Sequence, residues 1–212
     1  MKIAIFGASG NIGSRIVTEA LNRGHNVTAV VRQPENYILQ APHLRIAKGD
    51  LFNSQDVEAA VFDHDAVVCA YNFTKGATPS TITEITVPLL NGMKQAHVKR
   101  LVVIGGAGSL EVAPGIQSVD TPDFPDAYKP VALAHREALK NYQKETGLDW
   151  TYVSPSAEIT PGERTGNFRT GKDQMLFDEN GKSHISMEDF AVAIIDELEQ
   201  PKHIRERFTV GY

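Results

Sequence analysis

Three glycines near the N-terminus have the spacing of a phosphate-binding turn. Gly7, Gly10 and Gly13 lie in the segment GASGNIG, between an apolar run, IAIF, and an amphipathic run, SRIVTEALNRG. This order predicts a strand, a turn and a helix, in which the first glycine permits the turn, the second admits a pyrophosphate and the third lets the helix approach the strand. The free N–H groups and the dipole of a helix N-terminus favour negative phosphates. We expect a dinucleotide to contact Gly7, Ser9, Gly10, Asn11, Ile12 and Gly13.

The residue at the end of the second predicted strand, NVTAVVR, indicates which dinucleotide binds. NAD-specific proteins place a carboxylate there, about 20 residues beyond the glycines, for the ribose 2′-hydroxyl. This chain has Arg32, whose guanidinium suits the 2′-phosphate of NADP. Glu35, in the turn after Pro34, is the competing candidate, and a plain surface arginine is the remaining interpretation of Arg32. We predict NADP as the preferred cofactor, with NAD as the alternative.

Residues that follow two other predicted strands are further candidates, because ligands of open parallel sheets bind outside the carboxyl ends of the strands. Asp50 and Leu51 follow the third strand, and we expect them beside the adenine. Ala70, Tyr71 and Asn72 follow the fourth strand, and we expect them beside the ribose and the nicotinamide.

Short apolar runs that alternate with amphipathic segments must position these residues. The expected strands cover residues 2–6, 26–31, 44–49, 65–70, 100–105 and 149–154, with a last strand in RFTVG near the C-terminus. The expected helices cover residues 11–23, 54–62, 80–97 and 130–146. Nearly continuous apolar runs are typical of strands buried on both faces of a parallel sheet. The pattern predicts an α/β fold of the Rossmann type, a doubly wound parallel sheet of at least six strands with helices on both faces.

The length of the chain, 212 residues, fits a single domain that covers residues 1–212. After residue 154 the sequence becomes rich in Gly, Pro, Thr and Arg and shows no period. A long loop of this kind is usually functional, so we expect residues 155–185 to form a small lid on the substrate side. Ser186 and Asp189 resemble a capping box that opens one more helix.

Composition excludes several classes of function. The formal net charge is −5 and the sequence has no block of lysine and arginine, so no nucleic-acid partner is expected. No apolar run approaches the roughly 20 residues that span a bilayer. The apolar stretch before the first glycine is too short for the core of a signal peptide. We therefore expect a cytoplasmic protein without membrane contact. The single cysteine, Cys69, is interpreted as a buried core residue, and the histidines show no metal-ligand spacing.

The segment GASGNIGSRIVTEALNRGHNVTAVVR resembles the short-chain dehydrogenase/reductase superfamily. Its GxxGxxG spacing and several later motifs are similar to a compact atypical branch of NAD(P)H-binding proteins, described as NADH-flavin reductases and related to biliverdin-IXβ reductase. The later motifs are GGAGSL at 105–110, DWTYVSPS at 149–156, GKD at 171–173 and SHIS at 183–186. The resemblance implies a Rossmann fold and an NAD(P)H-dependent reductase.

Members of the superfamily that reduce carbonyls carry a Tyr-x-x-x-Lys pair, in which the tyrosine protonates the nascent alkoxide. In this chain the matching tyrosine is Tyr128, but Ala132 replaces the lysine, and Lys129 is adjacent in sequence and would point elsewhere. His135 is the other titratable residue of the predicted helix, and Ser109 lies where the superfamily places a substrate-contacting serine. The candidate catalytic residues are therefore Ser109, Tyr128 and His135, each with a purely structural role as the alternative.

The missing lysine favours a particular class of acceptor. A flavin or a quinone can take a hydride and hold the negative charge by delocalisation, so it does not require a protein acid. Arg164, Arg169 and Lys172 in the predicted lid are candidates to bind a flavin phosphate, with a solvated loop as the alternative. We predict a reductase that passes hydride from NADPH to a flavin or quinone-type small molecule. The alternatives are a non-catalytic NAD(P)-binding sensor of the NmrA-like kind and an epimerase or dehydratase, and the oligomeric state stays open.

Overall fold

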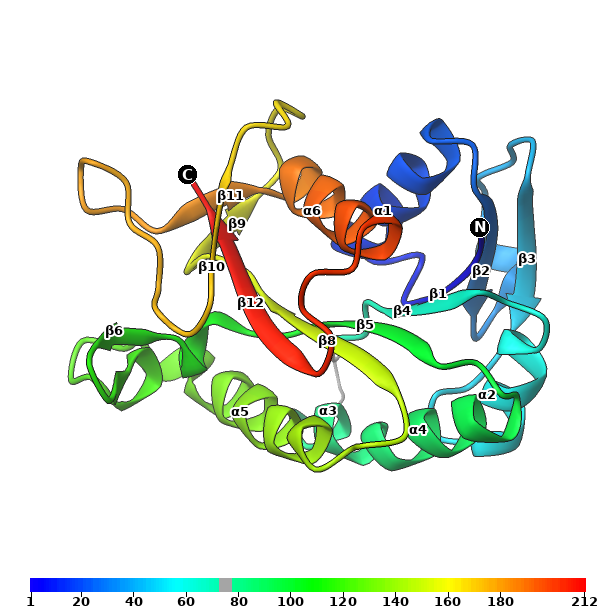
Figure 1. The fold of residues 1–212 in the computed structure, drawn as a ribbon, viewed down its shortest axis with the longest axis horizontal. Coiled ribbons are helices and arrows are strands. Elements are labelled where there is room, and N and C mark those ends of the chain that lie inside the picture. The colour runs from blue at the N-terminus through cyan, green and yellow to red at the C-terminus, as the bar shows by residue number, and fades with distance from the viewer. Residues whose placement is uncertain (73–77) are drawn as a thin grey trace.

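A twisted sheet runs through the middle of the molecule in the computed structural model, which describes residues 1–72 and 78–212 (Figure 1). In this part of the chain the sheet has eight strands in the order β10-β12-β8-β5-β4-β1-β2-β3. Neighbouring strands are parallel except for β10, which runs antiparallel to β12. The strands are β1 Lys2–Phe6, β2 Asn26–Val31, β3 Leu44–Lys48, β4 Ala66–Cys69, β5 Arg100–Ile104, β8 Asp149–Ser154, β10 Arg169–Gly171 and β12 Glu206–Gly211.

The central strands are buried on both faces, as their apolar sequences predict. Every residue of β4 and β5 is buried, and so is all of β1 after Lys2. Cys69 ends β4 inside the core, where burial raises the pKa of its thiol to about 11. The predicted α/β fold with a doubly wound parallel sheet is confirmed.

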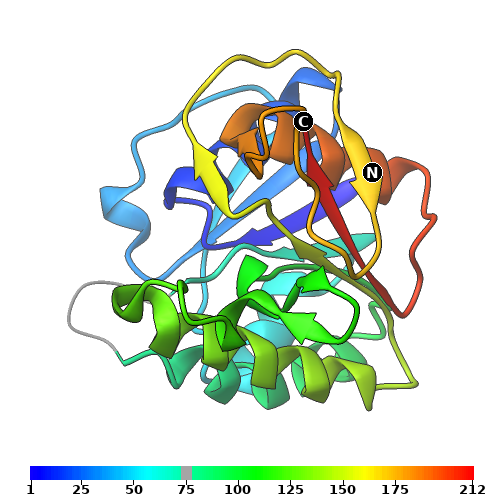
Figure 2. The ribbon, with the colours of Figure 1, turned by 90° about the vertical axis from the view of Figure 1, so that its left-hand side faces the viewer.

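Helices cover both faces of the sheet (Figures 1 and 2). One face carries α1 and α6, which pack on a core around Ile3, Ile16 and Phe190. The other face carries α2, α3, α4 and α5, which enclose a second core that includes Phe6 and Tyr152. The bounds are α1 Asn11–Asn22, α2 Ser54–Val61, α3 Thr81–Glu84, α4 Thr86–Gln95, α5 Lys129–Gln143 and α6 Met187–Glu199.

The predicted helix over residues 80–97 is divided into α3 and α4 at Ile85. Pro88 explains the division, because it has no N–H to donate to the carbonyl of Glu84 and its ring crowds that carbonyl. The other expected helices are present, with ends that differ by one to three residues from the sequence pattern.

The region predicted as a lid contains strands as well as loops. β9 Glu158–Thr160 pairs in parallel with β11 His184–Ser186, and β10 from the same region joins the main sheet. The predicted cap at Ser186 is present, since its Oγ accepts a hydrogen bond of 2.9 Å from the N–H of Asp189. A further hairpin, β6 Glu111–Ala113 and β7 Ile116–Gln117, follows β5.

Helix α4 packs on α2 through Gly92, and we predict that Gly92→Ala destabilises the protein. A methyl group on Gly92 would lie 2.5 Å from the carbonyl oxygen of Ser54 and 2.6 Å from Cβ of Val57. Alanine gains about 1 kcal/mol of helix propensity over glycine, but overpacking costs about 1–3 kcal/mol. We expect a net loss of about 1 kcal/mol in the free energy of unfolding, measured by urea denaturation. Asn91→Ala, on the exposed side of the same helix, is the control and should not destabilise; equal or greater stability of Gly92→Ala would contradict the packing argument.

Candidate functional site

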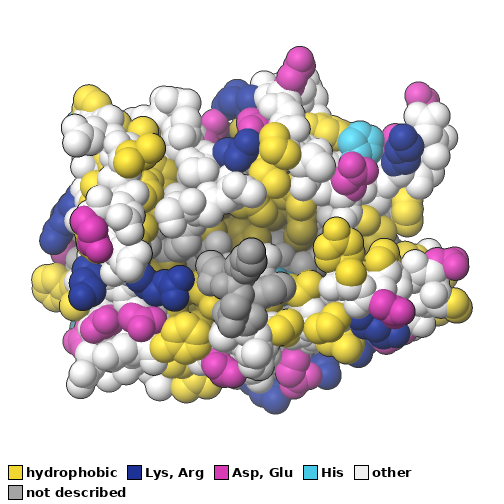
Figure 3. Space-filling model, turned by 180° about the vertical axis from the view of Figure 1, so that it is seen from behind, with side chains coloured by type: hydrophobic (Ala, Val, Ile, Leu, Met, Phe, Trp, Pro, Cys, Tyr) yellow, Lys and Arg dark blue, Asp and Glu magenta, His cyan; other side chains and the backbone are white. Residues whose placement is uncertain are grey.

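A cavity of about 890 Å³ lies at the carboxyl ends of the parallel strands. Figure 3 shows the hollow, with hydrophobic side chains lining its depth. Its volume is near the upper end of the range for ligand pockets. Six of the residues that line it directly follow the last residue of a parallel strand: Gly7, Arg32, Gly49, Ala70, Gly105 and Pro155.

The three glycines of the N-terminal turn serve different purposes. Gly7 has a φ of +73°, and a methyl group on it would lie 2.5 Å from the carbonyl oxygen of Ala70. On Gly13 a methyl group would lie 2.0 Å from the carbonyl oxygen of Gly7. On Gly10 it would meet only that same oxygen, at 3.2 Å, so the space above Gly10 is open to the cavity. The fold itself therefore excludes side chains at Gly7 and Gly13, whereas at Gly10 the open space suits a ligand.

The first turn of α1 offers backbone donors to that open space. Gly10 is the N-cap residue, the first turn has no acidic side chain, and no side chain in the described part of the chain caps it. The first helical bond runs from the N–H of Ser14 to the carbonyl of Gly10 at 2.9 Å, and Asn11 and Ile12 line the cavity. A helix end with uncapped N–H groups above a bare glycine fits a pyrophosphate.

The far end of the cavity contains the residues that the sequence predicts to contact the adenosine. Arg32 is exposed and lines the cavity, and within the described residues it forms no ion pair, whereas Glu35 is outside the lining. Leu51 is buried there, and Asp50 accepts a hydrogen bond of 3.1 Å from the N–H of Phe52. The Phe52 ring meets the ring of Tyr71 edge-on, with centroids 6.3 Å apart. Leu51, Phe52 and Tyr71 form an apolar wall beside the Arg32 guanidinium.

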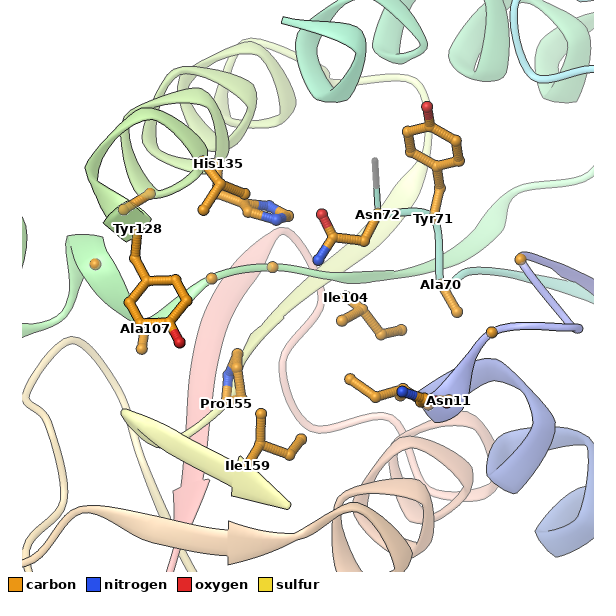
Figure 4. Close-up of a pocket in the computed structure, with 18 of the residues that line it drawn as sticks. Asn11, Ala70, Tyr71, Asn72, Ile104, Ala107, Tyr128, His135, Pro155 and Ile159 are labelled. Carbon is orange, nitrogen blue, oxygen red and sulfur yellow. The ribbon is translucent and has the colours of Figure 1, made fainter. Parts of the chain in front are cut away.

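At the other end, the loop after β5 lies very close to the helices and strands behind it. A methyl group on Gly105 would lie 2.0 Å from the ring of Tyr152, and one on Gly108 would lie 2.6 Å from Cβ of Ala132. Figure 4 shows Ile104 and Asn72 on the floor of this end, with Pro155 and Ile159 across from the ring of His135. The predicted contacts Ala70, Tyr71 and Asn72 all line the cavity, and the Tyr71 ring points away from its centre.

His135 is a neutral residue of the cavity wall. It is 7% exposed, and burial lowers the pKa of its imidazole to about 4. Its Nδ1 lies 3.2 Å from Oη of Tyr152, and the same hydroxyl donates to the carbonyl oxygen of His135 at 3.0 Å. An imidazole with this pKa is uncharged at neutral pH, so His135 does not act there as an imidazolium general acid.

Tyr128 lies at the mouth of the same end, just before α5, and is 65% exposed. In Figure 4 its ring extends past Ala107. Ala132, four residues on, is buried and lines the cavity, whereas the exposed Lys129 does not. The cavity therefore has no lysine in the position where carbonyl-reducing relatives hold one.

Ser109 does not reach the cavity, so its predicted contact with an acceptor is not supported. It is 2% exposed, and its Oγ accepts a hydrogen bond of 2.8 Å from Arg207. Arg207 also pairs with Asp173 at 2.5 Å. The tight packing of the glycine-rich loop turns Ser109 away from the ligand side and towards β12.

The structure does not support the predicted binding of a flavin phosphate by the lid residues, because none of the three lines the cavity and each has a partner elsewhere. Arg164 forms a two-pronged ion pair with Glu19 of α1, both contacts at 2.7 Å. Arg169 donates to the carbonyl oxygen of Phe177, and Lys172 lies 3.4 Å from Glu206. Most of the loop is exposed, as the alternative of a solvated loop predicts, but its contacts with Glu19 of α1 and Asp189 of α6 fix its position.

Asp189 is a second anchor of the same loop. It is fully buried and accepts hydrogen bonds from the N–H groups of Thr165 and Gly166, both at 2.8 Å, and from the hydroxyl of Tyr212 at 2.7 Å. Burial disfavours its charge, but these hydrogen bonds outweigh that effect and hold the pKa of the carboxyl below its usual value. The loop therefore has a defined position over α6.

One wall of the cavity was missed from the sequence. The segment 118–128 after the β6–β7 hairpin closes the end opposite the glycine turn. Besides the predicted Tyr128, it contributes Ser118, Thr121, Asp123, Phe124 and Pro125. Its sequence, SVDTPDFPDAY, has no helical or strand period. In this sequence, two prolines bracket an aromatic residue, and this pattern indicates a rigid loop that can face a ligand.

A doubly wound sheet with a glycine turn, an uncapped helix end and a cavity across the strand ends defines a dinucleotide-binding protein. The chain belongs to the NAD(P)H-binding family, whose model matches residues 7–201.

Several relatives resemble the chain over nearly its whole length. The uncharacterized protein YwnB of Bacillus subtilis (strain 168) is 42% identical over 213 residues, which cover 99% of this chain and 98% of that protein. The structure of a candidate epimerase of Bacteroides thetaiotaomicron matches with a TM-score of 0.92 and 44% identity. The match covers 100% of this chain and 96% of the epimerase chain. A candidate NADH-flavin reductase of Streptococcus pneumoniae TIGR4 has a TM-score of 0.88 and 34% identity, with coverage of 100% and 99%. These relatives confirm the resemblance to atypical short-chain dehydrogenases/reductases.

The described residues also bear on membranes and metals. No helix in residues 1–72 and 78–212 is both long and apolar enough to cross a membrane. The same residues contain no group of three or more His, Cys, Asp or Glu side chains that could hold a metal ion. The cytoplasmic location and the single domain stay predictions.

We predict that Gly10→Val removes dinucleotide binding without unfolding the protein. The side chain would enter open space rather than the core, and it would occupy the place of the pyrophosphate. We expect no measurable NADPH binding by fluorescence titration, with a thermal unfolding midpoint close to that of the wild type. Gly13→Val is the contrasting variant and should fail to fold, because its Cβ would overlap the carbonyl of Gly7. Wild-type affinity for NADPH in a folded Gly10→Val protein would show that the site lies elsewhere.

Proposed function

We propose that this protein is an NADPH-dependent reductase of flat conjugated acceptors, flavins or quinones. One observation carries the proposal: a single cavity joins a pyrophosphate-type glycine turn to an apolar chamber whose lining, among residues 1–72 and 78–212, has a neutral histidine and no lysine. The candidate NADH-flavin reductase among the relatives supports the same class of reaction.

The residues of the glycine turn and of the strand ends would hold the cofactor. Backbone N–H groups at Asn11 and Ile12 would face the pyrophosphate, Leu51 would lie beside the adenine, and Asn72 beside the nicotinamide ribose. Bound NADPH would supply the hydride, two electrons with one proton, that reduces the acceptor.

The acceptor end would orient a planar ring and exclude water. Phe124, Pro125, Ile159 and Met187 provide apolar surfaces around it. At this end the described lining has no lysine or arginine, and His135 is uncharged at neutral pH. An acceptor that can hold a negative charge after hydride transfer, or take its proton from water, suits such a site.

Arg32 supports NADP over NAD. Its guanidinium lies at the adenosine end of the cavity and forms no ion pair with the described residues, whereas the competing Glu35 does not line the cavity. A 2′-phosphate would supply the missing partner in a charge-assisted contact.

The test of the proposed function is anaerobic turnover. The purified protein, NADPH and a flavin such as FMN should give sustained loss of absorbance at 340 nm above a control without protein. Gly10→Val supplies the matched negative control, because it should lose the cofactor site but keep the fold. Tight NADPH binding without turnover of flavins or quinones would instead favour a non-catalytic sensor, an alternative that the absent lysine also supports.

We predict that Arg32→Asp reverses the choice of cofactor. Hydrogen bonds to charged groups contribute roughly 1.5–3 kcal/mol, so loss of the contact should weaken NADPH binding about tenfold or more. NADH binding should be unchanged or improved, because a carboxylate can accept from a ribose hydroxyl but repels a phosphate. The measurement is a pair of titrations with NADPH and NADH. Arg45→Asp, an exposed change of equal charge outside the cavity lining, is the control; a wild type that binds both cofactors equally would refute the assignment.

A further inference from the structure

The hydrogen bonds around His135 fix which of its ring nitrogens carries the proton. Tyr152 Oη lies 3.0 Å from the carbonyl oxygen of His135 and 3.2 Å from its Nδ1. A phenol has one hydrogen, and a carbonyl can only accept. Both contacts are hydrogen bonds only when the phenol donates to the carbonyl and Nδ1–H donates to the phenol oxygen. The opposite tautomer would leave two oxygen lone pairs facing each other at 3.0 Å.

The second nitrogen, Nε2, is therefore an acceptor. In a neutral imidazole with its proton on Nδ1, Nε2 holds a free lone pair. Nδ1 is turned towards the buried Tyr152, and His135 lines the cavity, so Nε2 is the ring nitrogen left for a ligand. Within the described part of the chain, Nε2 has no hydrogen-bond partner. It also is not fully buried, so a ligand can reach it. Figure 4 shows the ring extending from α5 into the chamber, towards Asn72.

Packing holds the ring in this orientation. A methyl group on Gly106 would lie 3.1 Å from Cβ, Cγ and Cδ2 of His135, so the glycine lets the backbone lie flat against that edge of the imidazole. The phenol of Tyr152 is buried in the core, and burial raises its pKa, so it stays a neutral donor. The position and the tautomer of His135 are thus set by the fold before any ligand arrives.

We propose that Nε2 of His135 accepts a hydrogen bond from a ring N–H of the acceptor, so that the site takes imide-bearing heterocycles such as flavins in preference to quinones. This inference rests on the proposed function and narrows it. A quinone has only carbonyl oxygens at its polar edges, and these would face the lone pair of Nε2. His135 is then a specificity-determining residue that Tyr152 positions.

The binding test compares lumiflavin with 3-methyl-lumiflavin, which lacks the imide N–H. Both are titrated by flavin fluorescence into the protein saturated with NADP⁺, so that no turnover occurs. A neutral hydrogen bond is worth about three- to tenfold in affinity, so the wild type should bind lumiflavin more tightly by that factor. His135→Leu should bring the two affinities together. Equal affinities in the wild type, or no binding of lumiflavin, would overturn the inference.

The tautomer is tested independently of activity. Nitrogen-15 NMR of histidine-labelled protein should show a protonated Nδ1 and an unprotonated Nε2 for His135, identified by the loss of its signals in His135→Leu. Tyr152→Phe should release this tautomer and reduce the preference for lumiflavin. A proton on Nε2 in the wild type would overturn the inference.

The two proposals fail in different ways. NADPH oxidation with lumiflavin, but without a preference over the methylated flavin, would leave the reductase function standing and remove the role of His135. A preference in binding without any turnover would support the role of His135 and remove the reductase function.

Discussion

The approach of α1 to the end of β1 is the constraint on which the site depends. A Cβ on Gly13 would sit 2.0 Å from the carbonyl oxygen of Gly7, so the helix begins where only bare backbone fits. That closeness brings the uncapped N–H groups of the first turn to the edge of the sheet, beside the ends of β1 and β4. A larger residue at either position would move the helix end away from the cavity and remove the anion-binding geometry.

A second set of close contacts shapes the acceptor end. Gly105 and Gly108 let the chain after β5 lie against Tyr152 and Ala132, with Gly106 against His135 between them. These contacts bring the loop after β5, Ala132 and His135 together in the wall of the chamber. Glycines thus serve the two ends differently: at the dinucleotide end they expose backbone donors, and at the acceptor end they allow side chains from α5 and β8 to approach.

Ion pairs with α1, which are partly exposed except at the Glu19 carboxylate, hold the last part of the chain over α1 and α6. Glu19 is 4% exposed and binds both Arg164 and Arg23, and Glu188 pairs with Arg15 at 2.5 Å. Hydrogen bonds outweigh the effect of burial on Glu19, and the pKa of its carboxyl is lowered. These contacts place Ile159 and Met187 at the cavity and leave no lid arginine facing a ligand. Breaking one partner of such a pair leaves an uncompensated charge, so the loop depends on all of them together.

Whereas β10 and the division between α3 and α4 emerge only in the structure, the sequence by itself determined the parallel strands of the sheet, most of the helices and the residues at the strand ends. These rest on local rules: apolar runs make buried strands, GxxGxxG makes one kind of turn, and residues after parallel strands gather at one edge, as Arg32 and Asp50 do. Only the tertiary structure decided the acceptor end. Ser109 turns to Arg207, Arg164 turns to Glu19 and residues 118–128 close the chamber. Each of these contacts joins segments far apart in the chain, where side-chain direction depends on packing that no local pattern records.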